Sequence, residues 1–274
     1  MSHYTNLWQQ RYGAAPAALP PTGQAVIEQL LSHRSVRAFL PDALPDGTLQ
    51  TLLAAAQSAA SSSNLQAFSV VAVQDPARKA RLAVLAGRQA HIEQVPLFLV
   101  WVADLSRLDR TAARLLRASA ANRTLEMFLV AAVDAALAAQ NAVVAAEALG
   151  LGTVYIGALR NHPEAVAAEL KLPPNAFALF GLCVGHPDPA KPTAIKPRLP
   201  QSAVLHLETY AQSAQTETEA VAAYDELIQS FQHSQGLAPM PWSQQASQRV
   251  AGPQSLSGRD RLAQILRGLG FGLE

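Results

Sequence analysis

The segment from Thr124 to Leu149 constrains the fold most, because it is apolar nearly all round and is predicted to be one long helix. A helix that is hydrophobic on every side must be buried on every side. In a chain of 274 residues, such a helix is expected in the core of a dimer. The small residues that would let a second helix approach it closely are Ala131, Ala135, Ala138, Ala142 and Ala145.

The same segment is not expected to span a membrane. A spanning helix needs roughly 20 mostly uncharged apolar residues. A second apolar run, at 95–103, is too short to span a membrane. The N-terminus lacks the basic-then-apolar order of a signal peptide, so we expect a cytoplasmic protein. The long segment itself is interrupted by Asp134, Gln140, Asn141 and Glu147.

Elsewhere the sequence pattern alternates strands with helices. Helices outweigh strands, and no phosphate-binding loop follows a strand, which favours an α+β sheet wrapped by helices over a doubly wound nucleotide fold. Residues 1–22 are rich in Ala and Pro and are expected to form an arm without packed structure. Strands are predicted at 68–73, 96–103, 153–156 and 178–184. Helices are predicted at 24–32, 46–59 (with Asp46 as the N-cap), 75–86, 163–170, 217–232 and 259–269.

Charge and cysteine content exclude several classes of protein. Only 15% of residues are charged and the formal net charge is +1, whereas nucleic-acid-binding domains usually carry a strong basic excess. The single cysteine, Cys183, excludes an intrachain disulfide and is expected to be a small buried hydrophobe. No metal site is predicted, because His91, His162 and His186 lack the spacing of metal ligands.

Two short basic motifs stand out, His33-Arg34-Ser35-Val36-Arg37 and Lys196-Pro197-Arg198-Leu199-Pro200. Guanidinium groups bind phosphate oxygens bidentately, and lysine adds a compact positive charge. Arg34 and Arg37 are three residues apart and would point to one side of a turn. We therefore hypothesise that both motifs close on one phosphate-bearing cofactor. Taken singly, the first could equally be a solvated helix end, and the second a basic surface loop.

Two further segments could line such a cofactor. No nucleophile elbow surrounds the loop Ser61-Ser62-Ser63-Asn64, so hydrogen bonding to a ring system is favoured over a hydrolase triad. Gly157 follows a predicted strand and would permit close backbone approach to a ligand. Gly150-Leu151-Gly152 lacks the third glycine of the dinucleotide fingerprint and is expected to end the long helix.

In their order along the chain, these motifs resemble those of the FMN-dependent nitroreductases. The resemblance is greatest to the large oxygen-insensitive NADPH-dependent branch, which includes nitroreductase A and the bacterial flavin reductases. It covers about residues 24–210. It is carried by HRSVR at 33–37, ASSSNLQ at 60–66, GRQ at 87–89, AQNA at 139–142, GLGTVYIG at 150–157 with Arg160-Asn161, FGLCVG at 180–185 and KPRLP at 196–200.

The resemblance implies a nitroreductase-like α+β fold with a central, mostly antiparallel sheet. It also implies a homodimer with FMN at the subunit interface and the long helix in the shared core. We expect an N-terminal arm at 1–22, an FMN-binding core at 23–210 and a C-terminal helical extension at 211–274 that packs on the core. The residues that would contact FMN are His33, Arg34, Ser35, Arg37, Ser61, Ser62, Ser63, Asn64, Gln89, Tyr155, Ile156, Gly157, Lys196 and Arg198.

Within that set the resemblance implies separate roles. Lys196 and Arg198 would help to hold the phosphate, and Arg37 would stabilise negative charge near the pyrimidine end of the ring. The stretch from Tyr155 to Gly157 would offer backbone groups near the reactive nitrogen N5.

The implied activity is ping-pong hydride transfer from NADPH or NADH through FMN to nitroaromatics, quinones or flavins. Such chemistry needs no acid or base from the protein. Arg160 would help to bind NAD(P)H. The region 234–242 has no arginine, although in this branch a loop there carries arginines that bind the 2′-phosphate of NADPH, so the nucleotide preference is left open. A flavin-binding sensor or scaffold without efficient reductase activity is the alternative from another class.

Overall fold

The computed structural model describes residues 2–15, 24–210 and 213–274. The chain divides into two compact units. The smaller unit combines residues 1–34 with 193–256, and the larger unit combines residues 35–192 with 257–274.

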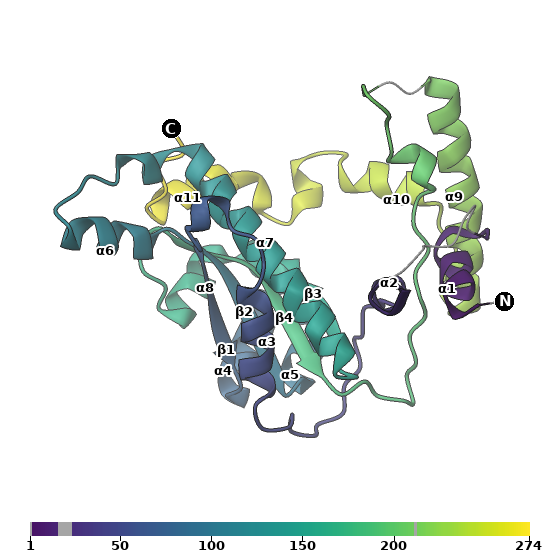
Figure 1. Cartoon of the computed structure of the whole chain (residues 1–274), viewed down its shortest axis with the longest axis horizontal. Coiled ribbons are helices and arrows are strands. Elements are labelled where there is room, and N and C mark those ends of the chain that lie inside the picture. Colours follow the sequence, from purple (N-terminus) through teal and green to yellow (C-terminus); the bar gives the residue numbers. More distant parts are fainter. Residues whose placement is uncertain (1, 16–23, 211–212) are drawn as a thin grey trace. The chain divides into compact units, whose positions relative to one another are not determined.

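The larger unit is built on a four-stranded sheet in the order β1-β2-β4-β3, and every neighbouring pair of strands is antiparallel (Figure 1). The strands are β1 Phe68–Val73, β2 Leu97–Asp104, β3 Gly152–Ile156 and β4 Ala176–Gly185. Every residue of β2 is buried. A strand covered on both faces is expected to be continuously apolar rather than alternating, and the sequence of β2 is apolar up to Asp104.

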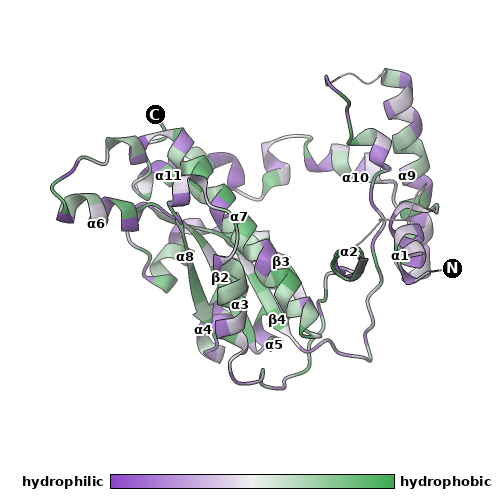
Figure 2. Cartoon of the chain, viewed as in Figure 1, coloured by the Kyte–Doolittle hydropathy of each residue, from purple (hydrophilic) through white to green (hydrophobic). Residues whose placement is uncertain are grey.

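Helices cover both faces of this sheet. On one face, Leu52 of α3 and Ala139 of α7 belong to one buried core with Leu99 of β2. On the other face, Leu82 of α4 packs in a core with Phe98 of β2. Figure 2 shows apolar residues along the strands and along α7. The helices of this unit are α3 Thr48–Gln57, α4 Pro76–Leu85, α5 Ala90–Gln94, α6 Ser106–Arg114, α7 Leu125–Ala148, α8 Pro163–Leu170 and α11 Leu262–Gly268, with short 3-10 turns η1 Ser62–Asn64, η2 Ala120–Arg123, η3 Gly157–Asn161 and η6 Arg259–Arg261.

Helix α7 has 24 residues and is a core helix of the larger unit. Its length and composition would also suit a membrane span, but it packs on the sheet through residues such as Ala138 and Val143. The single chain buries only part of this helix, so the expected burial on every side in a dimer core stays a prediction. Four apolar residues spaced four apart, which we call the α7 stripe, are each more than 40% exposed: Leu125, Leu129, Val133 and Leu137.

The smaller unit corrects the expectation of an unpacked arm at residues 1–22. Residues 3–12 form a helix, α1, that buries Tyr4, Leu7 and Arg11, and residues 16–22 lie outside the described residues. The expected division into a core at 23–210 and an extension at 211–274 stays a prediction. The helices of this unit are α1 His3–Tyr12, α2 Gln24–Leu31, α9 Ala214–Ser234 and α10 Trp242–Arg249, with 3-10 turns η4 Gln201–Ala203 and η5 Pro253–Leu256.

Most predicted elements are present, with local corrections. The N-cap of α3 is Gly47 rather than Asp46, and α10 forms where no helix was predicted. Gly152, expected in a turn, begins β3, and a Cβ on it would lie 2.8 Å from Val36. Cys183 is fully buried as predicted, and burial raises the pKa of its thiol.

Candidate functional site

Arg11 joins the two basic motifs within the smaller unit. Its guanidinium donates hydrogen bonds to the carbonyl of Lys196 at 2.7 Å and to that of His33 at 2.9 Å. A third bond reaches the carbonyl of Leu31 at 2.8 Å. Because one planar group contacts both main chains, the start of the first motif at His33 lies beside the second motif at Lys196 within this unit, although their sequence positions differ by more than 160 residues.

The second motif is also held from its other side. The amide of Arg198 donates to the carbonyl of Arg11 at 2.9 Å, and the Tyr224 hydroxyl of α9 donates to the carbonyl of Pro197 at 3.0 Å. Burial raises the pKa of Tyr224, while the nearby Arg198 and Arg11 charges oppose that rise. The Lys196 and Arg198 side chains remain exposed on this fixed backbone.

A cavity of about 600 Å³ lies beside Arg198 in the smaller unit. Its walls are largely aromatic and aliphatic, which leaves Arg198 as its charged group. There is consequently room next to this guanidinium for a bulky anion. The residues lining it are Tyr12, Arg198, Leu199, Gln201, Val204, Leu205, Tyr224 and Trp242.

The first motif continues into the larger unit along β3. Ser35 pairs with Thr153 in a parallel bridge, and the amide of Val36 donates to the Thr153 carbonyl at 2.8 Å.

Burial lowers the pKa of His91, and the positive charge of Arg37 lowers it further. The segment that carries Gln89 and His91 therefore lies near Arg37. The side-chain amide of Gln89 donates to the carbonyl of Ala86 at 2.8 Å.

The polar loop Ser61–Asn64 is ordered by Asp134, which the sequence reading treated only as an interruption of an apolar helix. Asp134 is buried in α7 and accepts hydrogen bonds from the Ser61 hydroxyl at 2.7 Å, the Ser62 amide at 3.2 Å and the Ala67 amide at 3.0 Å. Ser63 and Asn64 have φ of 50° and 54°, a left-handed conformation that side chains rarely adopt. The carboxylate thus holds a strained loop in one shape.

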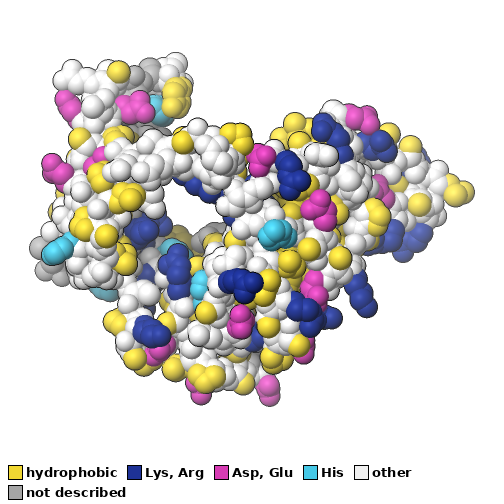
Figure 3. All heavy atoms as spheres, turned by 180° about the vertical axis from the view of Figure 1, so that it is seen from behind, with side chains coloured by type: hydrophobic (Ala, Val, Ile, Leu, Met, Phe, Trp, Pro, Cys, Tyr) yellow, Lys and Arg dark blue, Asp and Glu magenta, His cyan; other side chains and the backbone are white. Residues whose placement is uncertain are grey.

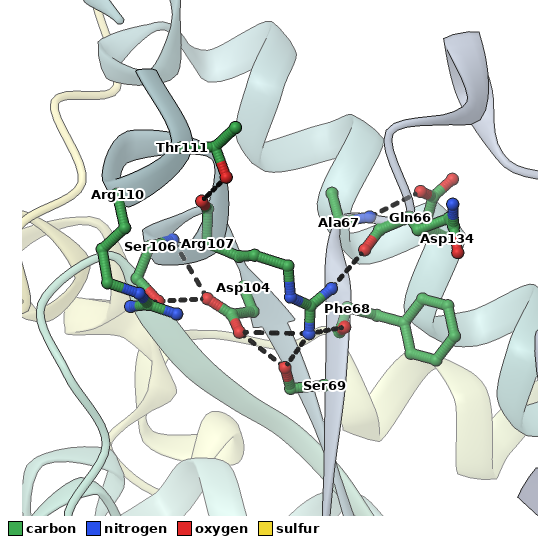
Figure 4. Close-up of polar contacts among 10 residues, drawn as sticks. All are labelled: Gln66, Ala67, Phe68, Ser69, Asp104, Ser106, Arg107, Arg110, Thr111 and Asp134. Atoms are coloured by element: carbon green, nitrogen blue, oxygen red, sulfur yellow. Dashed lines mark hydrogen bonds and ion pairs between the residues drawn. The ribbon is translucent and has the colours of Figure 1, made fainter. Parts of the chain in front are cut away.

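A second polar network fixes the chain immediately after this loop (Figure 4). Arg107 of α6 donates to the carbonyls of Gln66 at 2.9 Å and Phe68 at 3.1 Å. Asp104, buried at the end of β2, accepts from the Ser69 hydroxyl at 2.5 Å. The two networks together fix both ends of the segment that carries the polar loop.

The end of β3 presents the third predicted segment. Ile156 is buried, whereas Tyr155 is partly exposed and its ring meets Phe180 edge-on, with ring centroids 5.2 Å apart. Gly157 then begins η3, and a Cβ on it would lie 3.4 Å from the Arg160 guanidinium. The absence of a side chain at Gly157 leaves this main chain open next to Arg160.

Arg160 folds back over the protein. Its Nη1 donates to the carbonyl of Leu179, so part of the guanidinium is engaged with the protein itself. The adjacent Asn161 accepts a hydrogen bond of 2.8 Å from Arg259 of η6. Arg259 therefore contacts the neighbour of the predicted nucleotide residue, and sequence reasoning missed it because Asn161 and Arg259 are 98 positions apart.

Charge alone does not mark the site. On the face drawn in Figure 3, Lys and Arg side chains lie interspersed with Asp and Glu. The residues predicted to contact FMN or NAD(P)H are distributed over both units. His33, Arg34, Lys196 and Arg198 belong to the smaller unit, and Ser35, Arg37, Ser61–Asn64, Gln89, Tyr155–Gly157 and Arg160 belong to the larger.

Comparison with known families agrees with the resemblance. The sequence model of the Nitroreductase family matches residues 30–186, and that of the Nitroreductase family C-terminal domain matches residues 196–274. An FMN reductase (NADPH) of Bacillus subtilis is 40% identical over 222 residues, which are 80% of this chain and 88% of the relative. An oxygen-insensitive NADPH nitroreductase of Salmonella typhimurium is 39% identical over 210 residues, covering 77% of this chain and 83% of the relative.

Solved structures give the same result. The structure of B. megaterium NfrA1 superposes with a TM-score of 0.85 at 39% identity, covering 90% of this chain and 99% of that one. The NADPH:FMN oxidoreductase from Vibrio harveyi, complexed with NAD+, superposes with a TM-score of 0.79 at 35% identity, covering 91% and 99%. The predicted α+β, nitroreductase-like fold is confirmed.

Proposed function

Because this chain belongs to the nitroreductase family, we propose that it is an FMN-dependent NAD(P)H oxidoreductase that reduces flavins, nitroaromatics or quinones. The observation that carries the proposal is the meeting of the two basic motifs on Arg11. Relatives named as FMN reductases and NADPH nitroreductases support it. They do not favour the alternative of a flavin-binding sensor or scaffold.

The donor set of the smaller unit suits a phosphate monoester. Arg34, Lys196 and Arg198 carry exposed cationic side chains on adjoining main-chain segments. Charge-assisted hydrogen bonds from arginine and lysine are the strongest contacts that a protein offers to such an anion. The cavity beside Arg198 leaves space for it. These residues, with His33, would hold the phosphate of FMN.

The larger unit supplies the groups suited to a flat, polar ring. Ser35, Arg37, Gln89 and the loop Ser61–Asn64 offer hydroxyl, amide and guanidinium groups. Tyr155 and Ile156 end β3, and Gly157, which has no side chain, follows them. When bound, FMN supplies the hydride-transfer chemistry. The task of Arg37 would be to stabilise negative charge on the pyrimidine side of the ring, because a fixed cation favours charge that develops beside it.

NADPH or NADH would be the electron donor. Arg160 is the residue we assign to nucleotide binding, and Arg259 adds a second cation next to its neighbour Asn161. The stretch 234–242 contributes no arginine. We therefore expect both nucleotides to be accepted, with less preference for NADPH than an arginine-bearing loop would give.

We further propose a cytoplasmic homodimer with FMN at the subunit interface. The α7 stripe supports this, since a row of apolar side chains left exposed on a core helix is suited to burial against a second copy. In such a dimer some contacts of the ring would come from the partner subunit.

The test is spectroscopic. The purified protein should be yellow with bound FMN and should lose its visible flavin absorbance when NADPH or NADH is added without oxygen. The colour should return when a quinone or nitroaromatic is supplied. A protein that takes up no FMN, or whose bound flavin is reduced by neither nucleotide, would contradict the proposal.

A further inference from the structure

The N-terminal helix α1 lies before the part of the chain that matches the family, which begins at residue 30. Its buried residue Arg11 nevertheless contacts both basic motifs. Arg11 is 5% exposed, unusually low for an arginine. This combination shows that α1 is part of the packed structure around the motifs.

The contacts of Arg11 determine how far apart the motifs lie. One guanidinium reaches three carbonyls, those of Leu31, His33 and Lys196, at 2.7–2.9 Å. The guanidinium is rigid and planar, so carbonyls bound to it are held in a fixed arrangement. The amide of Arg198 returns a bond to the carbonyl of Arg11, which ties α1 to the second motif at two points.

A phosphate site gains affinity when its donors are held in place before the ligand arrives. Lys and Arg side chains lose conformational freedom when they bind, and backbone that also had to become ordered would add to this cost. In this chain, Arg11 removes the backbone part of the cost for Lys196 and for His33, the neighbour of Arg34. Its own guanidinium points at carbonyl groups of the protein, so it acts through the motifs and not as a further ligand.

We propose that Arg11 is a positioning residue for the cofactor's phosphate group, and that α1 is thereby a working part of the cofactor site. The proposal rests on the proposed function, because it takes FMN as the bound phosphate ester. It assigns a role to an N-terminal segment that has none in the family match.

The experiment compares FMN with riboflavin, which has the same ring and sugar chain but no phosphate. Dissociation constants of both are measured by flavin fluorescence for the full-length parent, Arg11→Gln, Arg11→Lys and Leu7→Ala, each freed of bound flavin. Arg11→Gln removes the guanidinium group that donates hydrogen bonds to three carbonyls. Its Kd for FMN should rise about tenfold or more, the factor that ~1.4 kcal/mol produces, while its Kd for riboflavin should change less than about twofold.

The controls separate positioning from loss of structure. Leu7 is buried in the same helix, so Leu7→Ala removes apolar packing but keeps the hydrogen bonds of Arg11, and the ratio of the two Kd values should stay near that of the parent. Arg11→Lys keeps the positive charge but not the planar guanidinium group, and its Kd for FMN should rise by an intermediate factor. If Arg11→Gln does not fold, the Kd values of Arg11→Lys provide the test.

The inference is overturned if both Arg11 variants bind FMN as tightly as the parent, or lose FMN and riboflavin in equal proportion. A parent protein that binds neither flavin would overturn the proposed function, and this inference with it. Normal FMN binding by the parent together with an unchanged ratio in the variants would overturn the role of Arg11 alone.

Discussion

Asp134, in the middle of α7, accepts a hydrogen bond of 2.7 Å from the hydroxyl of Ser61, which lies 73 positions earlier in the chain. The same carboxylate accepts two backbone amides of the loop segment. A loop whose residues take up left-handed conformations depends on such a partner, because the local backbone preference opposes its shape.

Asp134→Asn should therefore loosen this loop. Three donors converge on the carboxylate, but an amide has one accepting oxygen and brings donors of its own. We expect the free energy of unfolding to fall by about 2 kcal/mol and FMN binding to weaken, measured by urea denaturation and flavin titration. Asp109→Asn is the matched control, since Asp109 accepts hydrogen bonds from Asn122 at 2.7 Å and from Asn175 at 2.8 Å, neither of which belongs to the loop segment. It should lower stability with little effect on FMN binding. An equal loss of FMN affinity in both variants would show that the loop has no special role.

Arg198→Ala should weaken FMN binding by roughly 1.5–3 kcal/mol, the range for hydrogen bonds to charged groups. Riboflavin binding should be unaffected, because the lost partner is assigned to the phosphate. Arg249→Ala provides a control arginine on α10 of the same unit. If Arg198→Ala retains FMN as tightly as the parent, the phosphate site has been placed on the wrong segment.

Val133→Glu should disrupt the proposed dimer. Val133 lies in the α7 stripe and is 54% exposed in the single chain. Burying an unpaired carboxylate at an apolar interface is costly, so the dimer dissociation constant should rise about tenfold or more, as measured by sedimentation. Leu116→Glu, at a residue that is 95% exposed elsewhere in the larger unit, should leave the assembly unchanged. A Val133→Glu protein that remains dimeric would rule out the stripe as the interface.

The stability contributed by Glu169 should depend on pH in a defined direction. Hydrogen bonds from Arg81 and Arg78 hold the pKa of Glu169 at about 2, below its ordinary value of 4.5. A carboxylate with a lowered pKa in the folded state stabilises the fold above pH 4.5, and this contribution disappears as the pH falls towards 2. The parent should thus be more stable than Glu169→Gln at pH 7, and urea denaturation should show the two converging near pH 2.

The control for this prediction is the exposed pair of Arg123 and Glu274, whose side chains are 64% and 65% exposed. Solvent screens such pairs, so Glu274→Gln should change stability less than Glu169→Gln at pH 7. A gap between the parent and Glu169→Gln that stays constant from pH 7 to pH 2 would contradict the assignment.

The elements that could be predicted are those whose sequence signals are local. The helix expected at 163–170 is present as α8 with a proline in its first turn, and β2 follows from an unbroken apolar run. The helix α1 was missed because the Ala- and Pro-rich composition of residues 1–22 obscured the apolar positions Tyr4 and Leu7. The helix α10 was missed because it is short and polar, with Trp242 as its one large apolar residue.

In the candidate site, too, features with a local sequence signal could be predicted, and long-range contacts could not. Its basic motifs could be predicted because closely spaced cations are visible in the sequence. The residues that organise them could not. Asp134 is an interruption when α7 is read by itself, and Arg11 is an unremarkable charge in an N-terminal segment. Their importance comes from partners 20 to 185 positions away, and such pairings arise only when the chain has folded.

Arg107 has a consequence for how the protein behaves at high concentration. It donates to the carbonyls of Gln66 and Phe68 at the start of β1, which is an outer strand of the sheet. An outer strand with open backbone acceptors can recruit a strand from another molecule and so begin aggregation. At this end of β1 two acceptors are already in use, and an incoming strand would first have to displace a charged side chain. The contact that secures a loop inside one molecule therefore also discourages molecules from joining along their sheets.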